Sequence, residues 1–398
     1  MLATPTDRIA SAISRLGAEN AFMVLARARV LEAQGRRIVH MEVGEPDFDT
    51  PTHIKEAAIA ALHENYTHYS PSTGINELRD VVADYVSRFR GITPAYTRDN
   101  VTVSPGAKPV IWNIMSAIIN PGDHFVYFSP AYPAYASAAS YLQADVTAIS
   151  LHESANWRPD LDELDRAVTP KTKAIAINSP HNPTGGILTL SDLERIAEIA
   201  IRNDCLVIAD EIYSRNFYLD EKFVSIASLP GMRERTIIVD GFSKAYAMTG
   251  WRLGYAVMPE TLQHVVTLFN NNTFSCVATF VQRAGIAALT GPDEPVRKMN
   301  AIFRERRDRI VNGLNKIPGV TCTLPEGAFY AMPNITAITH DDKKLAQFML
   351  EEVGVACNGG SAFGEAGKGY LRFSYAASLD DIDWALAQMT EKLPLFKG

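Results

Sequence analysis

The chain has 398 residues, of which 47% are hydrophobic, so it can bury a substantial core and form two domains. Its formal net charge of -7 at pH 7 argues against a nucleic-acid partner, because such proteins usually carry a basic face. Its apolar runs are broken well short of the roughly 18 residues that span a bilayer, and its first residues lack the apolar core of a signal peptide. We therefore expect a cytoplasmic protein with no membrane partner.

The cysteines and histidines show no pattern of a metal site. The four cysteines lie far apart with no CxxC pair, and Cys205 opens an apolar strand pattern, which is typical of a buried structural thiol. None of the nine histidines pairs with another His, Cys or Glu at a metal-binding spacing. The sequence therefore predicts no metal.

The first hundred residues predict helices separated by turns. Apolar residues at helical spacing over 11–35 predict one N-terminal helix there, and residues 37–48 then form a short strand that runs into Gly44, where the backbone can approach a ligand closely. Pro51 starts an amphipathic helix, and a second one follows a Ser/Pro/Gly turn. Tyr69 precedes that turn, from which its phenol could reach a site, although a surface position is the plainer interpretation.

Residues 99–258 alternate between strand, loop and helix. Apolar strand runs separated by helical patterns are typical of a mostly parallel sheet with helices on both faces, and ligands bind at the carboxyl ends of such strands. The glycine turn at 105–107 opens a helix whose backbone N–H groups suit a phosphate, although neither GxxxxGK[ST] nor GxGxxG is present. The residues expected to converge at the strand ends are Gly106, Tyr132, Asn182, Asp210 and Lys244.

The stretch GFSKAYAMTGWRLGYAV at 241–257 holds the candidate nucleophile. Lys244 lies on the connection between two apolar strand patterns, where functional groups are commonly presented. A lysine amine does covalent chemistry by forming a Schiff base with an aldehyde, and the commonest such aldehyde in proteins is pyridoxal 5′-phosphate (PLP). Arg252 offers a planar fork of donors for its phosphate. Asp210 ends a buried strand, where a carboxylate is costly unless paired, so we expect a cationic partner.

The chain changes character after Thr261. Two long helical patterns extend to about residue 316, and the remainder mixes short strands, helices and a glycine-rich loop, which predicts a smaller α+β unit. Arg372 alternates with apolar Leu371 and Phe373, so we expect it to point away from the core side of its strand, where it can hold a carboxylate bidentately. An exposed arginine at a sheet edge is the plainer interpretation.

Seven motifs carry a resemblance that covers essentially the whole chain. They are VGEPDF at 43–48, HYSPSTGINELR at 68–79, SPHNPTGG at 179–186, ADEIY at 209–213, FSKAYAMTGWRLGY at 242–255, PEGAFY at 325–330 and LRFSYA at 371–376. In this order and spacing, the chain resembles the fold-type I PLP-dependent aminotransferases of class I, particularly the bacterial aspartate aminotransferase branch. The resemblance implies an α/β fold with a large PLP-binding domain at 48–290, whose mostly parallel sheet is flanked by helices, and a smaller, discontinuous α+β domain formed by 1–47 and 291–398.

The resemblance also implies which residues hold PLP. Lys244 would form the Schiff base and then move a proton between the amino acid Cα and the cofactor, as general acid and base. Asp210 would keep the pyridine nitrogen protonated, so that the ring accepts electrons. The other expected cofactor contacts are Tyr132 stacked on the ring, Tyr213 and Asn182 at the ring oxygen, Gly106, Ala107, Ser243 and Arg252 at the phosphate, and Tyr69 at the phosphate of the neighbouring subunit of a homodimer.

For the substrate, the resemblance implies that Arg372, with Asn182 and the Gly44 backbone, clamps the α-carboxylate. Lys108 stands where one bacterial subgroup uses a lysine for the distal carboxylate of aspartate or glutamate. That position favours a dicarboxylic substrate, whereas a solvated lysine at a helix start is the alternative.

Two other positions depart from the family pattern. Tyr132 stands where many relatives have tryptophan, so stacking is kept and a hydroxyl is added. Gly241 stands where some relatives place a phosphate-binding serine, so one phosphate hydrogen bond would be missing.

The function expected from this resemblance is amino transfer between an L-amino acid and a 2-oxo acid such as 2-oxoglutarate. The alternative is a PLP-dependent lyase, cyclase or oxidase acting on a specialised amino acid, because a fold does not determine which bond breaks. A regulator that uses such a domain as a sensor is disfavoured, since VGEPDF begins at residue 43 and the chain is acidic.

Overall fold

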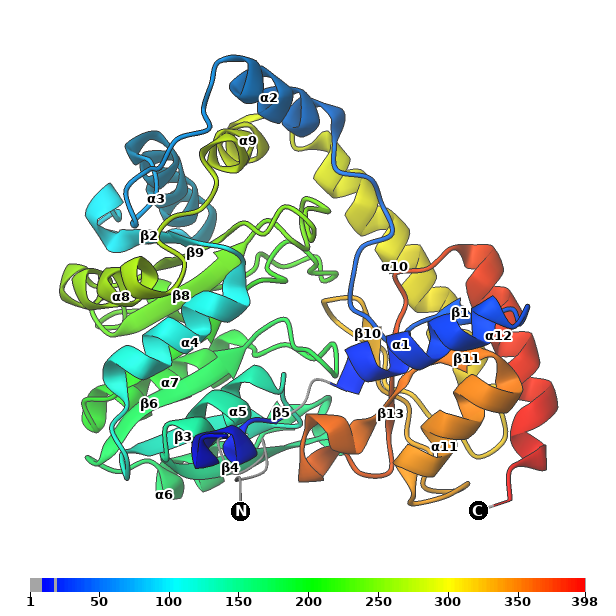
Figure 1. The fold of residues 1–398 in the computed structure, drawn as a ribbon. Helices are drawn as coiled ribbons and strands as arrows, with labels where there is room; N and C mark the ends of the chain where they lie inside the picture. Colours follow the sequence, from blue (N-terminus) through cyan, green and yellow to red (C-terminus); the bar gives the residue numbers. More distant parts are fainter. Residues whose placement is uncertain (1–8, 18–19, 398) are drawn as a thin grey trace, which may run out of the picture.

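The computed structural model describes residues 9–17 and 20–397, and its main feature is an eight-stranded sheet of order β2-β9-β8-β7-β6-β3-β4-β5 (Figure 1). The strands are β2 (Val101–Ser104), β3 (His124–Ser129), β4 (Asp145–His152), β5 (Arg158–Pro159), β6 (Thr172–Asn178), β7 (Leu206–Asp210), β8 (Thr236–Gly241) and β9 (Gly254–Val257). The run from β4 through β3, β6 and β7 to β8 is parallel, whereas β9 is antiparallel to both β8 and β2, and β5 is antiparallel to β4. The prediction of a mostly parallel sheet is confirmed.

Helices cover both faces of this sheet because successive residues of a buried strand point to opposite sides. On β6, Ala174 and Ala176 pack with α4 (Ala107–Ile118), α5 (Ala134–Tyr141) and α8 (Glu260–Thr273). Ile175 and Ile177 pack on the other face with α6 (Leu161–Ala167) and α7 (Leu190–Arg202). Both faces of the strand are therefore apolar, as the continuous apolar run in the sequence requires.

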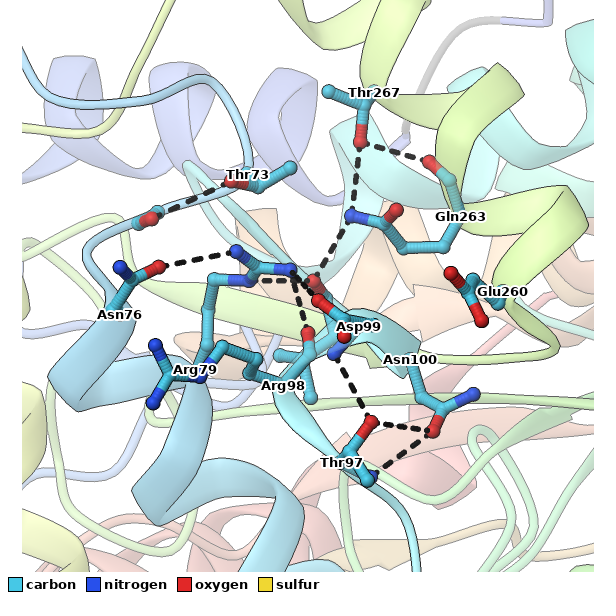
Figure 2. A network of polar contacts seen from close by, with 12 residues as sticks. Thr73, Asn76, Arg79, Thr97, Arg98, Asp99, Asn100, Glu260, Gln263 and Thr267 are labelled. Atoms are coloured by element: carbon cyan, nitrogen blue, oxygen red, sulfur yellow. Dashed lines mark hydrogen bonds and ion pairs between the residues drawn. The ribbon is translucent and has the colours of Figure 1, made fainter.

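Side chains close the β2 edge of the sheet (Figure 2). Arg79 from α3 (Asn76–Arg90) and Gln263 from α8 each donate to the Val101 carbonyl, both at 3.2 Å. Arg79, which is 8% exposed, also donates to the Arg98 carbonyl at 2.7 Å. An edge strand otherwise presents unpaired backbone groups. These contacts hold β2 in place, together with the turn at Gly106 that follows it.

A second, smaller unit lies beside the carboxyl ends of the large sheet (Figure 1). It contains a three-stranded sheet of order β10-β13-β12 and the parallel pair β1-β11. Its elements are α1 (Asn20–Ala33), β1 (Val39–His40), α10 (Glu294–Leu314), β10 (Tyr330–Ala331), α11 (Asp342–Phe348), the π-helical turn η6 (Met349–Val353), β11 (Val355–Ala356), β12 (Asn358–Gly359), β13 (Leu371–Ser374) and α12 (Leu379–Lys392). Its core is a separate apolar cluster that includes Phe303, Phe329 and Tyr375. The predicted smaller α+β unit is confirmed.

Two helical predictions are wrong in detail. Residues 11–35 form a short 3-10 turn, η2 (Ser11–Arg15), and the separate helix α1, because Leu16 is already extended with φ -79° and ψ 127°. The stretch after Thr261 holds three helices rather than two: α8, α9 (Thr279–Thr290) and α10. Ser275, with φ 62°, stands in the break between α8 and α9. Helical spacing of apolar residues continues across both breaks, which is why the pattern did not reveal them.

The chain between β1 and β2 packs as two further helices, α2 (Thr52–His63) and α3. Both join α9 in one apolar cluster against the end of the sheet.

Across residues 9–17 and 20–397, no helix combines the length and the apolar character that a membrane crossing needs. Over the same residues, His, Cys, Asp and Glu side chains form no group of three that could hold a metal ion. Cys205 is buried and unbonded, and burial raises the pKa of its thiol to about 11.

Candidate active site

A cavity of about 490 Å³ lies at the carboxyl ends of β6 and β7 and is also lined by residues of the smaller unit. Because β9 runs antiparallel to β8, the loop that joins them stays at this edge of the sheet. That topology brings the lysine loop beside the ends of β6 and β7. The sequence-predicted residues that line the cavity are Gly44, Ala107, Lys108, Tyr132, Asn182, Asp210, Tyr213, Ser243, Lys244, Arg252 and Arg372.

Lys244 is held over aromatic rings in this cavity. Its Nζ donates to the Gly44 carbonyl and lies 6.0 Å from the centre of the Tyr213 ring and 5.9 Å from that of Phe329. Gly44 approaches so closely that a Cβ there would lie 1.9 Å from the Tyr330 hydroxyl. The predicted need for glycine at this turn therefore has a steric reason.

Arg252 and the start of α4 form a cradle for an anion. The Arg252 guanidinium donates to the carbonyls of Thr249 at 2.9 Å and Pro105 at 3.2 Å, beside the first turn of the helix. Gly106 has φ 97°, and a Cβ there would meet Arg252 Nη2 at 2.5 Å. Gly106 therefore lies behind the cradle rather than on the cavity surface. Backbone N–H groups at a helix N-terminus together with a guanidinium suit a phosphate.

Asp210 ends β7 and is 4% exposed. Its Oδ2 accepts a hydrogen bond from the Tyr135 hydroxyl at 2.5 Å, and its Oδ1 accepts from the backbone N–H of Ile212 at 3.2 Å. Burial raises the pKa of the Asp210 carboxyl to about 6, although the Tyr135 hydrogen bond opposes this rise. Among the described residues the side-chain hydrogen-bond partner of Asp210 is the neutral phenol of Tyr135, so the expected cationic partner stays a prediction, which the protonated ring nitrogen of PLP would fulfil.

A buried ion cluster lies directly behind Asp210. Arg90, from the last turn of α3, donates to Glu211 at 2.5 Å and to Asp240 at 2.6 Å. Burial raises the pKa of both carboxyls, and Arg90 opposes that rise. The cluster joins the end of β7 to the end of β8, and so fixes the spacing between Asp210 and the lysine loop.

Arg372 lies on β13 and is 4% exposed. Its guanidinium donates to Asn182 Oδ1 at 3.2 Å and to the Glu42 carbonyl, and its central carbon lies 4.7 Å from the Tyr330 ring centre and 4.8 Å from that of Phe363. Leu371 and Phe373 belong to the apolar core of the smaller unit, whereas Arg372 lines the cavity, so the arginine points away from the core side of its strand as predicted. The alternative of an exposed arginine at a sheet edge is wrong, because β13 lies between β10 and β12 and is buried along its whole length.

Tyr132 and Lys108 lie together at another wall of the cavity. Lys108 Nζ is 5.6 Å from the centre of the Tyr132 ring. Tyr69, in contrast, is 93% exposed and does not line this cavity. The structure therefore brings together all the predicted side chains except that of Tyr69.

Sequence reasoning missed several residues of this cavity and its support. Tyr330 pairs with Tyr213, their hydroxyls 2.6 Å apart, and Asn178 donates to the Asp210 carbonyl at 2.9 Å. Tyr135, whose hydroxyl donates to Asp210, stands three residues after Tyr132 in the sequence, and that spacing was a usable signal. Glu42, Asn358 and Arg90 carried no signal, because their partners lie far away in the sequence.

Gly241 has no room for the serine that some relatives place there. A Cβ at this position would lie 2.9 Å from the Gly254 Cα and 3.1 Å from the Leu253 carbonyl oxygen. The glycine thus permits β8 and β9 to pair closely at the point where the lysine loop begins.

Comparison with known proteins places this geometry in context. The family model described as Aminotransferase class I and II matches residues 36–387. The chain is 39% identical over 376 residues to the probable aspartate/prephenate aminotransferase of Aquifex aeolicus, which covers 93% of this chain and 94% of that relative. It is 38% identical over 364 residues to aromatic-amino-acid aminotransferase 2 of Thermococcus litoralis, with 91% and 93% covered. The crystal structure of the Rhizobium meliloti aspartate aminotransferase superposes with a TM-score of 0.92 at 33% identity, covering 97% of this chain and 99% of that one.

Proposed function

This chain belongs to the class I and II aminotransferases, which are PLP-dependent enzymes, and we propose that it moves the amino group of aspartate or glutamate to a 2-oxo acid such as 2-oxoglutarate. The single observation that supports the proposal is that one cavity holds an amine, a buried carboxylate and three cationic side chains. The named relatives differ in their amino donors, so the choice of donor rests on the cavity of this chain.

The residues present fit PLP. The cradle formed by Arg252, Ser243 and the first turn of α4 suits the phosphate, since a dianion needs convergent donors. Asp210 offers a buried acceptor whose own partner is a neutral phenol, which suits a ring N–H. Tyr132 offers a flat face for stacking. When bound, PLP supplies a ring that withdraws electrons from the substrate Cα.

Lys244 is the proposed covalent attachment point and the base that moves the proton at the substrate Cα. Its Nζ reaches the cavity beside the Tyr213 ring, and the Gly44 carbonyl holds it there. Tyr213 is oriented in turn by the hydroxyl of Tyr330 at 2.6 Å.

Arg372 is the proposed clamp for the substrate α-carboxylate. The guanidinium is almost fully desolvated and is flanked by the rings of Tyr330 and Phe363. Charge-assisted hydrogen bonds are stronger away from water, so a carboxylate that enters here is bound firmly. Asn182, which already accepts from Arg372, is the proposed second contact.

Lys108 is the proposed contact for the distal carboxylate of a dicarboxylic donor. It lies in the first turn of α4, over the ring of Tyr132, and lines the same cavity as Arg372. Two cations in one cavity favour a substrate with two carboxylates.

We also propose that two copies of the chain share their active sites. Tyr69 is 93% exposed and does not line the cavity of its own chain. Such exposure is expected of a residue that contacts the phosphate in the neighbouring subunit. Phe22 and Met23 on α1 are also exposed, by 55% and 62%, and such apolar residues favour an interface. We further propose domain boundaries near residues 47 and 290 and a cytoplasmic location.

The test is a single-turnover absorbance scan in which each common L-amino acid is mixed with the holoenzyme without any oxo acid. We expect aspartate and glutamate to convert the cofactor band to that of its amino form, and 2-oxoglutarate to restore it. A response confined to aromatic amino acids would overturn the proposed donor. Irreversible bleaching with release of ammonia would instead favour a lyase.

A further inference from the structure

Glu42 is a buried carboxylate that the proposed chemistry does not use. It is 0% exposed, its Oε1 lies 2.8 Å from His40 Nδ1, and its Oε2 has no hydrogen-bond partner. The other nitrogen of His40 lies 3.0 Å from Glu32 on α1. Burying a carboxylate is costly unless a cation compensates it, and His40 is the group in contact that can supply the charge.

The backbone of the same segment touches both functional cations of the cavity. The Glu42 carbonyl accepts from Arg372 and, at 2.7 Å, from Asn358. Two residues later, the Gly44 carbonyl accepts from Lys244. The strand that precedes them, β1, has only two residues and pairs only with β11. Regular backbone pairing therefore ends before the carbonyls of Glu42 and Gly44, so side-chain contacts must hold these carbonyls in position.

We propose that His40 and Glu42 form an ion pair that positions the 42–44 backbone, and through it Arg372, for binding the substrate α-carboxylate. The inference rests on the proposed role of Arg372. His40 and Glu42 act through the carbonyl of Glu42 and are positioning residues rather than catalytic ones. A supporting layer of this kind holds a binding group within the narrow range of geometries that tight binding needs.

The charges around the pair determine how it responds to pH. The hydrogen bond to Glu42 is the main cause that raises the pKa of His40; burial opposes it, and Glu32 adds to the rise. Two further groups lie near Glu42. The Arg372 guanidinium donates to its carbonyl, and the Cys357 thiol, whose pKa is raised by burial, interacts with its charge. On α12, which packs near β1, Asp381 is paired with Arg37 at 3.0 Å.

The direction of the pH effect follows from this arrangement. Because the pKa of His40 is raised in the folded protein, the charged pair is complete below that pKa and is lost as the pH rises through it. The buried carboxyl group of Glu42 then loses the charge of the imidazole in contact with it. We therefore expect the affinity of the site for an α-carboxylate to fall over the same pH range.

The experiment measures binding of 2-aminoisobutyrate to the holoenzyme by the change in cofactor absorbance and by calorimetry. This amino acid has no α-proton, and its only carboxylate is the one that Arg372 is proposed to hold, so the result depends neither on turnover nor on the donor. The variants are His40→Gln, Glu42→Gln and the double variant, with Glu32→Gln as the matched control and Arg372→Leu as the benchmark.

We expect His40→Gln to weaken binding about tenfold at pH 7, which corresponds to about 1.4 kcal/mol, because it removes the charged group in contact with the buried carboxylate. The double variant should recover most of that loss, since two amides can bond without a charge, and it should lose the extra pH dependence of the wild type. Glu32→Gln should change binding less than threefold, because it removes only the partly exposed partner of the imidazole. Cofactor affinity should stay within twofold of the wild-type value in the His40, Glu42, double and Glu32 variants.

A second readout needs no ligand. The imidazole signals of His40 should titrate in NMR spectra with a raised pKa in the wild type, and Glu42→Gln should lower that pKa. If His40→Gln and Glu42→Gln bind 2-aminoisobutyrate like the wild type at every pH while Arg372→Leu does not, the inference is wrong and the proposed clamp stands. If Arg372→Leu binds normally, the proposed clamp itself fails and the inference fails with it.

Discussion

The two halves of the active site are built in different ways. The half proposed to bind the cofactor, called here the cofactor half, consists of Asp210, Asn182 and Lys244 with the anion cradle, and it follows the ends of buried strands that are paired along their length. The half proposed to bind the substrate, called here the substrate half, consists of Arg372, Asn358, Tyr330 and the 42–44 segment, and it comes from strands of two to four residues and from the irregular chain beyond them. Backbone pairing places the first half, whereas side-chain hydrogen bonds place the second.

Because of this difference, substitutions in the two halves should affect different properties of the enzyme. In the cofactor half a side chain can be replaced without loosening the frame that holds its neighbours, so the effect falls on chemistry or on local charge. In the substrate half each polar contact is part of the frame, so the effect should fall on substrate affinity. The following predictions test that distinction.

The largest effect is expected from Lys244→Ala. Turnover should fall by at least about 10⁴-fold, because the variant lacks both the covalent attachment point and the proton-transfer group. Its melting temperature without cofactor should remain near that of the wild type, since the side chain lies in the cavity, where its Nζ donates to the Gly44 carbonyl, and belongs to neither apolar core. Single-turnover rates and borohydride fixation of the cofactor measure the loss. A variant that keeps full turnover and a reducible cofactor bond would contradict the assignment.

Arg372→Leu should lower kcat/KM by about 10²- to 10⁴-fold for every amino donor, because two hydrogen bonds to a charged group are lost at about 1.5–3 kcal/mol each. Most of the change should appear as weaker binding of amino acids, with the cofactor still bound. Arg372→Lys is the matched variant, since it keeps the charge but not the fork, and should recover part of the loss. Equal losses in both variants would show that geometry, rather than charge, dominates at this position.

Asp210→Asn should raise the stability of the cofactor-free protein while weakening cofactor binding. Burial raises the pKa of Asp210 to about 6, so the folded protein binds this proton more tightly than the unfolded chain. The contribution of this group to stability is therefore complete at low pH and falls as the pH rises through about 4 to 6. We expect the cofactor-free variant to be more stable than the wild type at pH 7 to 8, by at most about 3 kcal/mol, and to bind PLP more weakly.

Denaturant unfolding of the cofactor-free proteins at pH 4 and pH 8 checks this prediction. Asp240→Asn is the matched control, because Asp240 is paired with Arg90 at 2.6 Å and its loss leaves a buried charge short of a partner. The control should be less stable than the wild type at both pH values. If Asp210→Asn destabilises the cofactor-free protein at pH 8, burial of its charge is not the main cost at this site.

The smallest effect is expected from Lys108→Ala. A partly exposed cation contributes about 1 kcal/mol, so kcat/KM for aspartate should fall about fivefold while that for alanine stays the same. Ratios of kcat/KM for the two donors measure this difference. An equal fall for both donors would assign Lys108 to the cofactor half instead.

Local patterns in the sequence identified most of the cofactor half. Asp210 and Lys244 each follow a continuous apolar strand, and strand ends of a parallel sheet meet at one edge, so their convergence needed no three-dimensional information. The same reasoning placed Asn182 and the turn at Gly106.

Only the tertiary structure decided what supports these groups. Tyr135 meets Asp210 across 75 residues, and Arg90 meets Glu211 across 121, so no periodic pattern connects them. Arg372 looked like an exposed edge residue because its strand alternates, yet the packing of the two units encloses it. The periodicity of apolar residues shows which face of a single helix or strand is buried. The whole fold determines which elements pack against each other, and therefore which charged side chains are buried together away from water.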